Sequence, residues 1–419
     1  MTRFTQKLST PFFSNAMRTV MLALVLVVFG TSTALAQTKG YVTNFLGNTV
    51  SVIDTATNTV IATVPVGNAP VGVAVTPNGA FAYVSNGGGD TVSVISTASD
   101  TVVATIPVGD FPALMDITPN GAFVYVVNAD EDTVSVIATA TNTVTATIPV
   151  GVQPQAVAIT PNGARAYVTD AFSDQVSVID TATNTVVTTI PGIVIPVWVA
   201  ITPDGAFAYV TSVAGDAITV IDTASNTVIA TIPGGGSLPT GVAITPNGAF
   251  AYVGSAFGPV FVIDTATNTV VATVPIRGAG ITITLDGAFA YLANQGNNTV
   301  SVIDTATNTV TATIPVGAAP FIIALQKILS PQDQIAALIA QVQGLIQGGV
   351  LTQDQGAGLI NKLNQVLAKL DAGQTGAACN QLSSFINQVN GLISNGSLTQ
   401  SQGQALIQAA NAVRTDLGC

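Results

Sequence analysis

Residues 51–67 have the sequence SVIDTATNTVIATVPVG, and this stretch occurs seven times along the chain with few changes. The Val-Ile pairs within the copies are separated by 42 residues five times and then by 40, and they begin at Val52, Val94, Val136, Val178, Val220, Val262 and Val302. A repeat of this length is one supersecondary unit stacked on its neighbours. The sequence therefore predicts a repeat architecture.

Each repeat contains four short β-strand candidates separated by turn residues. In the second copy they span residues 71–76, 80–86, 91–95 and 101–108, with Pro-Asn-Gly and Thr-Ala-Ser-Asp as turns. Four strands in about 42 residues are typical of a β-propeller blade. This architecture is favoured over a parallel β-helix, whose rungs are shorter.

The two ends of the repeat region complement each other. The chain enters at residues 41–44, YVTN, which correspond to the second strand of a repeat, and residues 317–325 align with residues 67–75, which include a first strand. A late strand that completes the first blade closes the ring and removes two sheet edges. The predicted fold is mainly β, a seven-bladed β-propeller of four-stranded antiparallel blades over residues 37–326, followed by a small all-α four-helix domain over residues 327–419.

The predicted helical domain is itself duplicated. Residues 341–356, QVQGLIQGGVLTQDQG, match residues 388–403, QVNGLISNGSLTQSQG, which predicts two similar αα-hairpins packed as a bundle. The candidate helix caps are Ser330, Thr352, Thr375 and Thr399.

The first 36 residues resemble a secretory signal peptide in composition. A basic leader precedes an apolar run over residues 20–29 and the small-residue end Ala34-Leu35-Ala36, so cleavage after Ala36 is expected; an uncleaved anchor is the alternative. We expect a secreted, periplasmic or cell-surface protein with no membrane span in the mature chain.

Cys379 opens the third predicted helix and Cys419 ends the fourth, so an antiparallel hairpin in an oxidising compartment predicts a disulfide between them. A redox or metal pair is the alternative.

The repeats resemble a known family. The segments at Tyr41, Tyr83, Tyr125 and Tyr167, YVTN, YVSN, YVVN and YVTD, with TPNGA and VIDTATNTV around them, are similar to the YVTN family of β-propeller repeats. That resemblance implies a bacterial or archaeal surface or exported protein. The C-terminal helical region is similar to the FIMAH domain of exported bacterial proteins.

Composition excludes several kinds of chemistry. The chain has no histidine, so it has no Ser-His-Asp or Cys-His nucleophile pair, no histidine metal ligand and no histidine haem ligand. Three of the 10 basic residues and none of the 21 acidic ones lie in residues 1–36, which leaves a mature charge of 7 − 21 = −14. Such a charge disfavours nucleic acid as a partner. We expect no catalytic residues, no resident metal and no cofactor.

Candidate binding residues lie where the repeats differ. Since strand direction alternates, the regular TPNG and DTATN turns fall on one face of the propeller, and the varied loops after YVTN and PVG fall on the other, which we call the variable face. The predicted ligand-binding residues are Trp198, Phe172, Phe111, Asp116, Phe257 and Arg277. Trp198 replaces a glycine of other blades and either stacks on a sugar ring or peptide side chain or plugs the channel. Arg277 pairs either with an anionic ligand or with a neighbouring aspartate.

Two acidic patterns have structural explanations as well as functional ones. The repeated VIDTA aspartates could ring a metal, but short polar side chains in such turns bond their own backbone, which is the favoured interpretation for Asp54, Asp180, Asp222, Asp264 and Asp304. The segment Asp130-Glu131-Asp132 is either a calcium ligand set or a solvated acidic loop.

The sequence favours an exported, non-enzymatic binding or scaffold protein that recognises a protein, glycan or surface partner through the variable face. The alternative is a propeller lactonase or hydrolase that uses carboxylates such as Asp116 with a metal. Single-stranded nucleic-acid binding through aromatic loops is a third hypothesis, which the charge opposes. The repeats do not specify an oligomeric state.

Overall fold

The structure is a computed structural model that describes residues 39–234, 237–326 and 330–419. The predicted signal peptide and its cleavage point lie outside the described residues. The described chain forms seven four-stranded antiparallel sheets followed by four helices, which confirms the predicted fold class.

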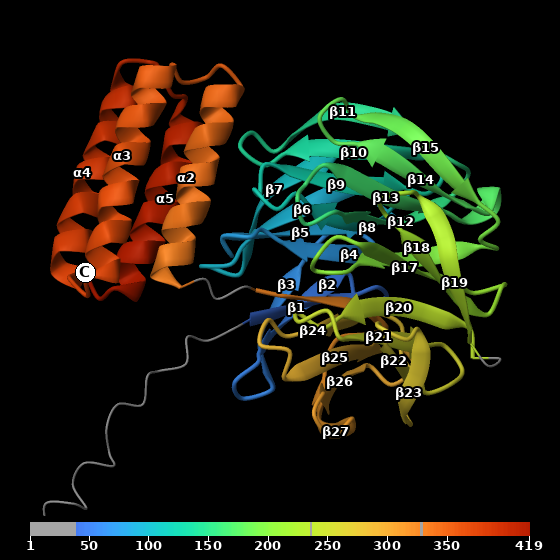
Figure 1. Ribbon diagram of the computed structural model, residues 1–419. Coiled ribbons are helices and arrows are strands. Elements are labelled where there is room, and N and C mark those ends of the chain that lie inside the picture. The colour runs from blue at the N-terminus through green and yellow to red at the C-terminus, as the bar shows by residue number, and fades with distance from the viewer. Residues whose placement is uncertain (1–38, 235–236, 327–329) are drawn as a thin grey trace, which may run out of the picture. The chain divides into compact units, whose positions relative to one another are not determined.

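Each sheet is one blade of the propeller, and its strands follow one another from the axis to the rim (Figure 1). Their bounds, in ring order, are β28 (Pro320–Leu325), β1 (Lys39–Asn44), β2 (Thr49–Asp54) and β3 (Thr59–Pro65) for blade 1; β4 (Pro70–Val75), β5 (Phe81–Asn86), β6 (Thr91–Ser96) and β7 (Thr101–Pro107) for blade 2; β8 (Pro112–Ile117), β9 (Phe123–Asn128), β10 (Thr133–Ala138) and β11 (Thr143–Pro149) for blade 3; β12 (Pro154–Ile159), β13 (Arg165–Asp170), β14 (Gln175–Asp180) and β15 (Thr185–Pro191) for blade 4; β16 (Pro196–Ile201), β17 (Phe207–Ser212), β18 (Ala217–Asp222) and β19 (Thr227–Pro233) for blade 5; β20 (Pro239–Ile244), β21 (Phe250–Ser255), β22 (Val260–Asp264) and β23 (Thr269–Val274) for blade 6; and β24 (Ile281–Ile283), β25 (Phe289–Asn294), β26 (Thr299–Asp304) and β27 (Thr309–Pro315) for blade 7.

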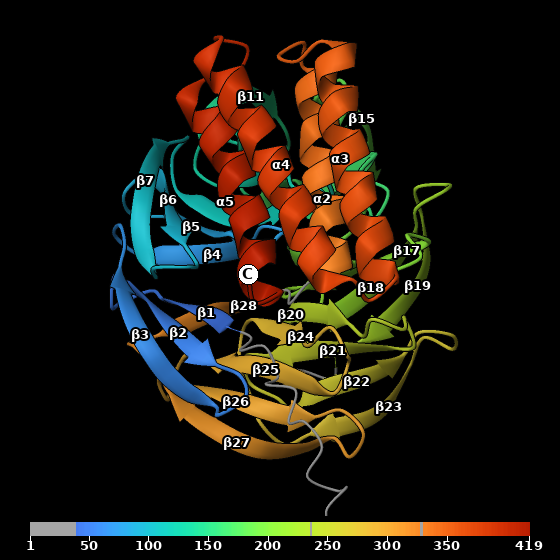
Figure 2. The ribbon, with the colours of Figure 1, turned by 90° about the vertical axis from the view of Figure 1, so that its left-hand side faces the viewer.

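Blade 1 is built from both ends of the repeat region. Strand β28 pairs antiparallel with β1, with Tyr41 opposite Ala324 and Val42 opposite Ile323. Figure 2 shows β1 and β28 side by side in the ring. The predicted late strand is therefore confirmed, and it closes the ring because it supplies the innermost strand that the chain start lacks.

A tyrosine in the second strand of every blade is buried and bonds to the next blade around the ring. In six blades its hydroxyl donates to the Oδ1 of an asparagine in the neighbouring TATN turn, at 2.6 to 3.0 Å. Each of these asparagines has a positive φ, which asparagine adopts more readily than most residues. The last bond, from Tyr291 to Asn58, joins blade 7 to blade 1 and completes the ring.

Blade 1 uses a charged version of the same contact. Tyr41 donates to Asp100 Oδ1 (2.9 Å), and Lys39 pairs with Asp100 Oδ2 (2.7 Å). Asp100 occupies the position that asparagine has in the other blades, and its extra charge is balanced by Lys39, the first residue of β1.

The Tyr–Asn contact predicts a measurable coupling between blades. Burial, the largest cause, raises the pKa of Tyr167 to about 12, so its hydroxyl remains a donor at neutral pH. Y167F should lower the free energy of unfolding by about 1 kcal/mol because Asn226 Oδ1 loses its donor. A urea-denaturation double-mutant cycle with N226G, which keeps the positive φ accessible, checks this. A coupling energy near zero would contradict an energetic role for the bond.

The helical domain has its predicted caps, with one exception. Its helices are α2 (Pro331–Gln347), α3 (Gln353–Asp371), α4 (Thr375–Ser394) and α5 (Gln400–Asp416). Ser330 caps α2, and Thr352 and Thr399 form capping boxes with the glutamines three residues later. The prediction for Thr375 was wrong: it is the first residue of α4, whose cap position is Gln374 with no side-chain cap bond. Within the described part of the chain, no helix is long and apolar enough to cross a membrane.

The two αα-hairpins repeat the same packing. At Gly356 in α3 and Gly403 in α5, a Cβ would lie 2.2 and 2.3 Å from the Cδ1 atoms of Ile346 and Ile393. Glycine accommodates this isoleucine side chain without any shift, and the equivalent pair occurs in each hairpin at the duplicated QG sequence. The duplication in the sequence is therefore also a duplication of helix packing.

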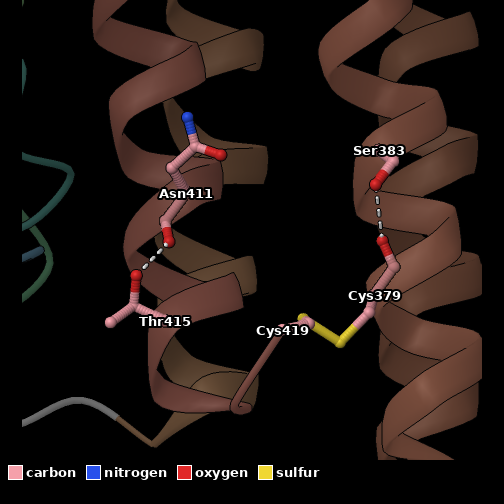
Figure 3. The surroundings of a disulfide bond; sticks show 5 residues. All are labelled: Cys379, Ser383, Asn411, Thr415 and Cys419. Carbon is pink, nitrogen blue, oxygen red and sulfur yellow. Dashed lines mark hydrogen bonds between the residues drawn. A yellow bond between two sulfur atoms is a disulfide. The ribbon is translucent and has the colours of Figure 1, made fainter.

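A disulfide joins Cys379 near the start of α4 to Cys419 at the chain end, with a Cα–Cα distance of 6.1 Å (Figure 3). The predicted pairing is therefore present. It closes a sequence separation of 40 residues within one hairpin.

Removing this disulfide should destabilise the helices selectively. C379S/C419S is expected to lower the stability of the helical domain by about 4 kcal/mol in the chain-entropy model. Far-ultraviolet circular dichroism of the helical signal measures the change. Trp198 is the only tryptophan and lies in the propeller, so its fluorescence provides the internal control. An equal shift of both transitions would show that the disulfide does not act locally.

Candidate binding site on the variable face

A pocket of about 770 Å³ opens on the variable face of the propeller. All seven blades contribute to it, through the loops after YVTN, the connections after PVG and the innermost strands. Its principal lining residues are Phe45, Phe111, Leu114, Gln155, Trp198, Phe257, Arg277, Asn294, Gln295, Asn297 and Phe321. The pocket is therefore aromatic and amide-rich, with one cationic side chain.

Trp198 and Phe321 form an aromatic pair within this pocket. They come from the innermost strands of blades 5 and 1, which are not neighbours in the ring. Their ring centroids lie 6.5 Å apart with an interplanar angle of 27°. Trp198 is half-buried against two of the hydrophobic clusters, and its exposed part lines the pocket.

Blades 2, 6 and 7 have glycine where blade 5 has Trp198, whereas blades 1, 3 and 4 have Ile322, Leu114 and Ala156. At Gly72 and Gly280 a Cβ would come within 2.6 and 2.5 Å of the main-chain oxygen of the next innermost strand. Those blades tolerate only glycine at this position. The position therefore accepts a side chain in some blades and not in others, and Trp198 is the largest of those side chains.

The structure brings together four of the six predicted ligand-binding residues and separates two. Trp198, Phe111, Phe257 and Arg277 line the pocket. Phe172 is 64% exposed on the variable face, in the short 3-10 helix η1 (Ala171–Ser173), but it does not line the pocket.

Asp116 is the second residue outside the pocket. Its Oδ1 accepts from the backbone N–H of Ile117 (2.8 Å), and its Oδ2 accepts from the backbone N–H of Ile159 (2.8 Å) in blade 4. The carboxylate thus ties the innermost strands of blades 3 and 4 together.

A polar latch connects successive blades on the variable face at six of the seven junctions. An asparagine or aspartate with positive φ in the turn after YVTN accepts, through Oδ1, from the backbone N–H of the residue before the next innermost strand, which also has positive φ in each case. The pairs are Asn48–Ala69, Asp90–Phe111, Asp132–Gln153, Asp174–Ile195, Asp216–Leu238 and Asn298–Ala319. These side chains are structural because they fix the entry of the next blade.

The junction between blades 6 and 7 has no such latch among the described residues. Residues 255–260 are one residue shorter than the equivalent turn, and the connection over residues 275–280 is two residues shorter. The chain instead forms an isolated bridge between Ser255 and Gly278. Phe257 (71% exposed) and Arg277 lie at this junction. The pocket residues that differ from the repeat therefore include two where the latch is missing.

The sequence signal for this junction was the single 40-residue spacing. It indicates the connection that contains Arg277 but not Asn294, Gln295 and Asn297, which follow β25, line the pocket and were not predicted. Gln155 was also missed, since a polar residue in an innermost strand does not by itself indicate which way its side chain is directed.

The acidic patterns have backbone partners. The VIDTA aspartates accept from N–H groups of their own turns, for example Asp304 from Thr307 (2.8 Å), as the favoured interpretation predicted. In the Asp130-Glu131-Asp132 segment, Asp132 is a latch residue and Glu131 accepts weakly from Thr133 (3.4 Å). Across the described ranges, no three His, Cys, Asp or Glu side chains are grouped so as to hold a metal ion.

Comparison with family models agrees with both parts of the structure. Residues 36–148 match the model described as lactonase, 7-bladed β-propeller, and residues 112–213 match the YNCE-like β-propeller model. Residues 335–415 match the FIMAH domain. The chain combines a seven-bladed β-propeller with a FIMAH-type helical domain.

Solved structures share the propeller architecture. Hydrazine synthase of Kuenenia stuttgartiensis is 28% identical with a TM-score of 0.58, over 64% of this chain and 92% of that chain. A functionally unknown protein from Desulfotomaculum acetoxidans is 20% identical with a TM-score of 0.63, over 68% and 98%. A proposed 6-phosphogluconolactonase from Bacteroides fragilis is 16% identical with a TM-score of 0.59, over 71% and 100%. The last two show the fold alone. No curated protein matches the chain.

One buried carboxyl in the propeller departs from the repeat. Asp170 occupies the position of Asn44, Asn86 and Asn128 and is completely buried. Burial raises its pKa to about 6, although hydrogen bonds from Ser177, Gln175 and the Gly151 backbone oppose the shift. Since the folded pKa exceeds the ordinary 3.8, the folded chain binds a proton between these values that the unfolded chain does not. Stability from this group is therefore gained as the pH falls and is lost as it rises through 6.

D170N should stabilise the propeller at pH 7.5. The amide is neutral at every pH, so the gain should reach up to about 3 kcal/mol and shrink towards pH 4. Thermal unfolding followed by Trp198 fluorescence across this pH range measures it. The control is D222N, because backbone and side-chain bonds from Ser225 lower the pKa of Asp222 and its replacement should not stabilise. A pH-independent effect of D170N would refute the titration account.

Proposed function

We propose that this chain is an extracellular, non-enzymatic recognition protein whose propeller binds a protein, glycan or surface partner in the variable-face pocket. The observation that supports it most is the convergence of residues from all seven blades, including the exposed Phe111 and Phe257, on one pocket. Exposed aromatic side chains around a concave site provide contact area at low conformational cost. The disulfide of the FIMAH-type domain supports an oxidising compartment, and we assign that domain the role of attachment module.

The regularity of the opposite face supports the same assignment. There the TPNG and DTATN turns use their side chains in bonds within and between blades, as in Thr76 to Asn78 and Tyr83 to Asn142. A face whose polar groups are committed to the scaffold has few groups left for a partner. The pocket therefore lies where the scaffold leaves side chains available.

The lactonase-type alternative is favoured by the lactonase family match over residues 36–148. It requires a metal site, and the described residues include no suitable cluster around Asp116, whose oxygens accept from two backbone N–H groups. Hydrolysis of D-glucono-δ-lactone with added Mg²⁺, Mn²⁺, Ca²⁺ or Zn²⁺ tests this alternative. Turnover that D116N abolishes would favour the enzyme.

Aromatic truncation separates the pocket from the rest of the face. F111A/F257A should reduce binding to immobilised cell-surface polysaccharide and protein fractions at least about tenfold, because two exposed rings of the pocket are removed. F172A is the matched control, since Phe172 is similarly exposed on the same face but outside the pocket. Biolayer interferometry measures both. Retained binding by the double variant, or equal loss in F172A, would overturn the assignment.

A further inference from the structure

We infer that the pocket binds an acidic sugar and that Arg277 binds its carboxylate. This inference rests on the proposed binding function and names the class of ligand. It starts from the charge of Arg277. Of the three cationic residues described in the propeller, Lys39 pairs with Asp100 and Arg165 pairs with Asp180. Arg277 is exposed, lines the pocket and makes no side-chain hydrogen bond or ion pair with the described residues.

The backbone around Arg277 is held on several sides. Its main-chain oxygen accepts from the Asn294 amide (3.0 Å) in the amide orientation that satisfies both groups of Asn294. The next residue, Gly278, donates to Ser255 O (3.1 Å) and accepts from Thr240 (3.1 Å). A backbone held by these hydrogen bonds limits the positions from which the exposed side chain can reach a ligand. Arg277 therefore has a defined location although its guanidinium has no protein partner.

The groups around Arg277 suit a sugar. Phe257 and Trp198 offer ring faces, on which the apolar face of a pyranose can stack. Gln155, Gln295 and Asn297 offer amides that both donate to and accept from hydroxyl groups. A guanidinium binds a carboxylate through two parallel N–H···O bonds, which a neutral sugar cannot accept. Together these groups favour a uronic acid over a neutral sugar or a simple anion.

The net charge of the protein does not prevent this. At physiological ionic strength the Debye length is about 8 Å, so distant surface charges are largely screened. On the variable face, the latch aspartates Asp90, Asp132, Asp174 and Asp216 belong to blades 2 to 5, whereas Arg277 opens blade 7. The junction that has no latch thus also has no latch carboxylate beside the arginine.

The single tryptophan reports on this site directly. The full chain is titrated with trigalacturonate and with α-1,4-galactotriose, which differ in the oxidation of C6, while Trp198 fluorescence is followed. Trigalacturonate should bind at least about tenfold more tightly, equivalent to about 1.4 kcal/mol. R277Q should remove this preference, R277K should retain part of it, and the equal charge change R165Q should leave it intact.

Three results would overturn the inference: equal affinity for the two sugars, a preference that survives R277Q, or no response to either sugar. Tighter binding of N-acetylphenylalanine than of trigalacturonate would assign the site to a peptide carboxylate. Displacement by inorganic phosphate at equal concentration would reduce it to a general anion site and would also overturn the sugar assignment. The proposed function is judged separately, by partner binding of F111A/F257A against F172A, so either can fail alone.

Discussion

The propeller depends on a hydrogen bond between the tyrosine of one blade and the TATN turn of the next. Burial raises the pKa of each tyrosine, to about 12 for Tyr209 and Tyr252, so the phenol remains a donor. Its acceptor needs a short side-chain carbonyl on a residue that tolerates positive φ, and asparagine provides both. Because every blade is at once donor and acceptor, one Tyr–Asn pairing serves six of the seven junctions, and Tyr41–Asp100 serves the seventh. This explains why tyrosine persists where the rest of YVTN varies.

The same ring explains why the two faces differ. On the regular face, turn residues are fixed by their bonds to the next blade, so the repeats cannot diverge there without losing contacts. On the variable face, each of the six latches bonds the backbone N–H of the residue before the next innermost strand, so the side chain of that residue can differ between blades, as Phe111 and Gln153 do. Blades 6 and 7 go further, since the bridge between Ser255 and Gly278 replaces the latch. The repeat sequence therefore varies most where the fewest side chains take part in bonds between blades.

Much of this fold could be predicted from sequence because its determinants are local. Period, alternation and turn residues predict four strands per blade, the GAAPFIIAL segment predicts closure, and Thr352 and Thr399 predict helix starts. The site could be predicted only in part. Phe172 lies on the expected face, whereas Asp116 is the next-to-last residue of β8 and lies beside the regular TPNG turn, so its predicted place on the variable face was wrong. Side-chain placement depends on register shifts and contacts across blades that periodicity does not contain. Likewise the missing residues after Val274 were visible as a spacing, while the bridge that replaces them was not.

The position of Arg277 follows from the same argument about what the scaffold requires. At the other six junctions the turn after YVTN supplies a latch residue, and at four of them this residue is an aspartate, which places negative charge at the junction. Shortening the connection removes that requirement and with it the anion, so a cation can remain without an ion pair. Burying a charge is costly unless it is paired, but Arg277 is exposed and incurs little of that cost. An exposed guanidinium on a fixed backbone remains available to a ligand, whereas Lys39 and Arg165 are already paired with Asp100 and Asp180.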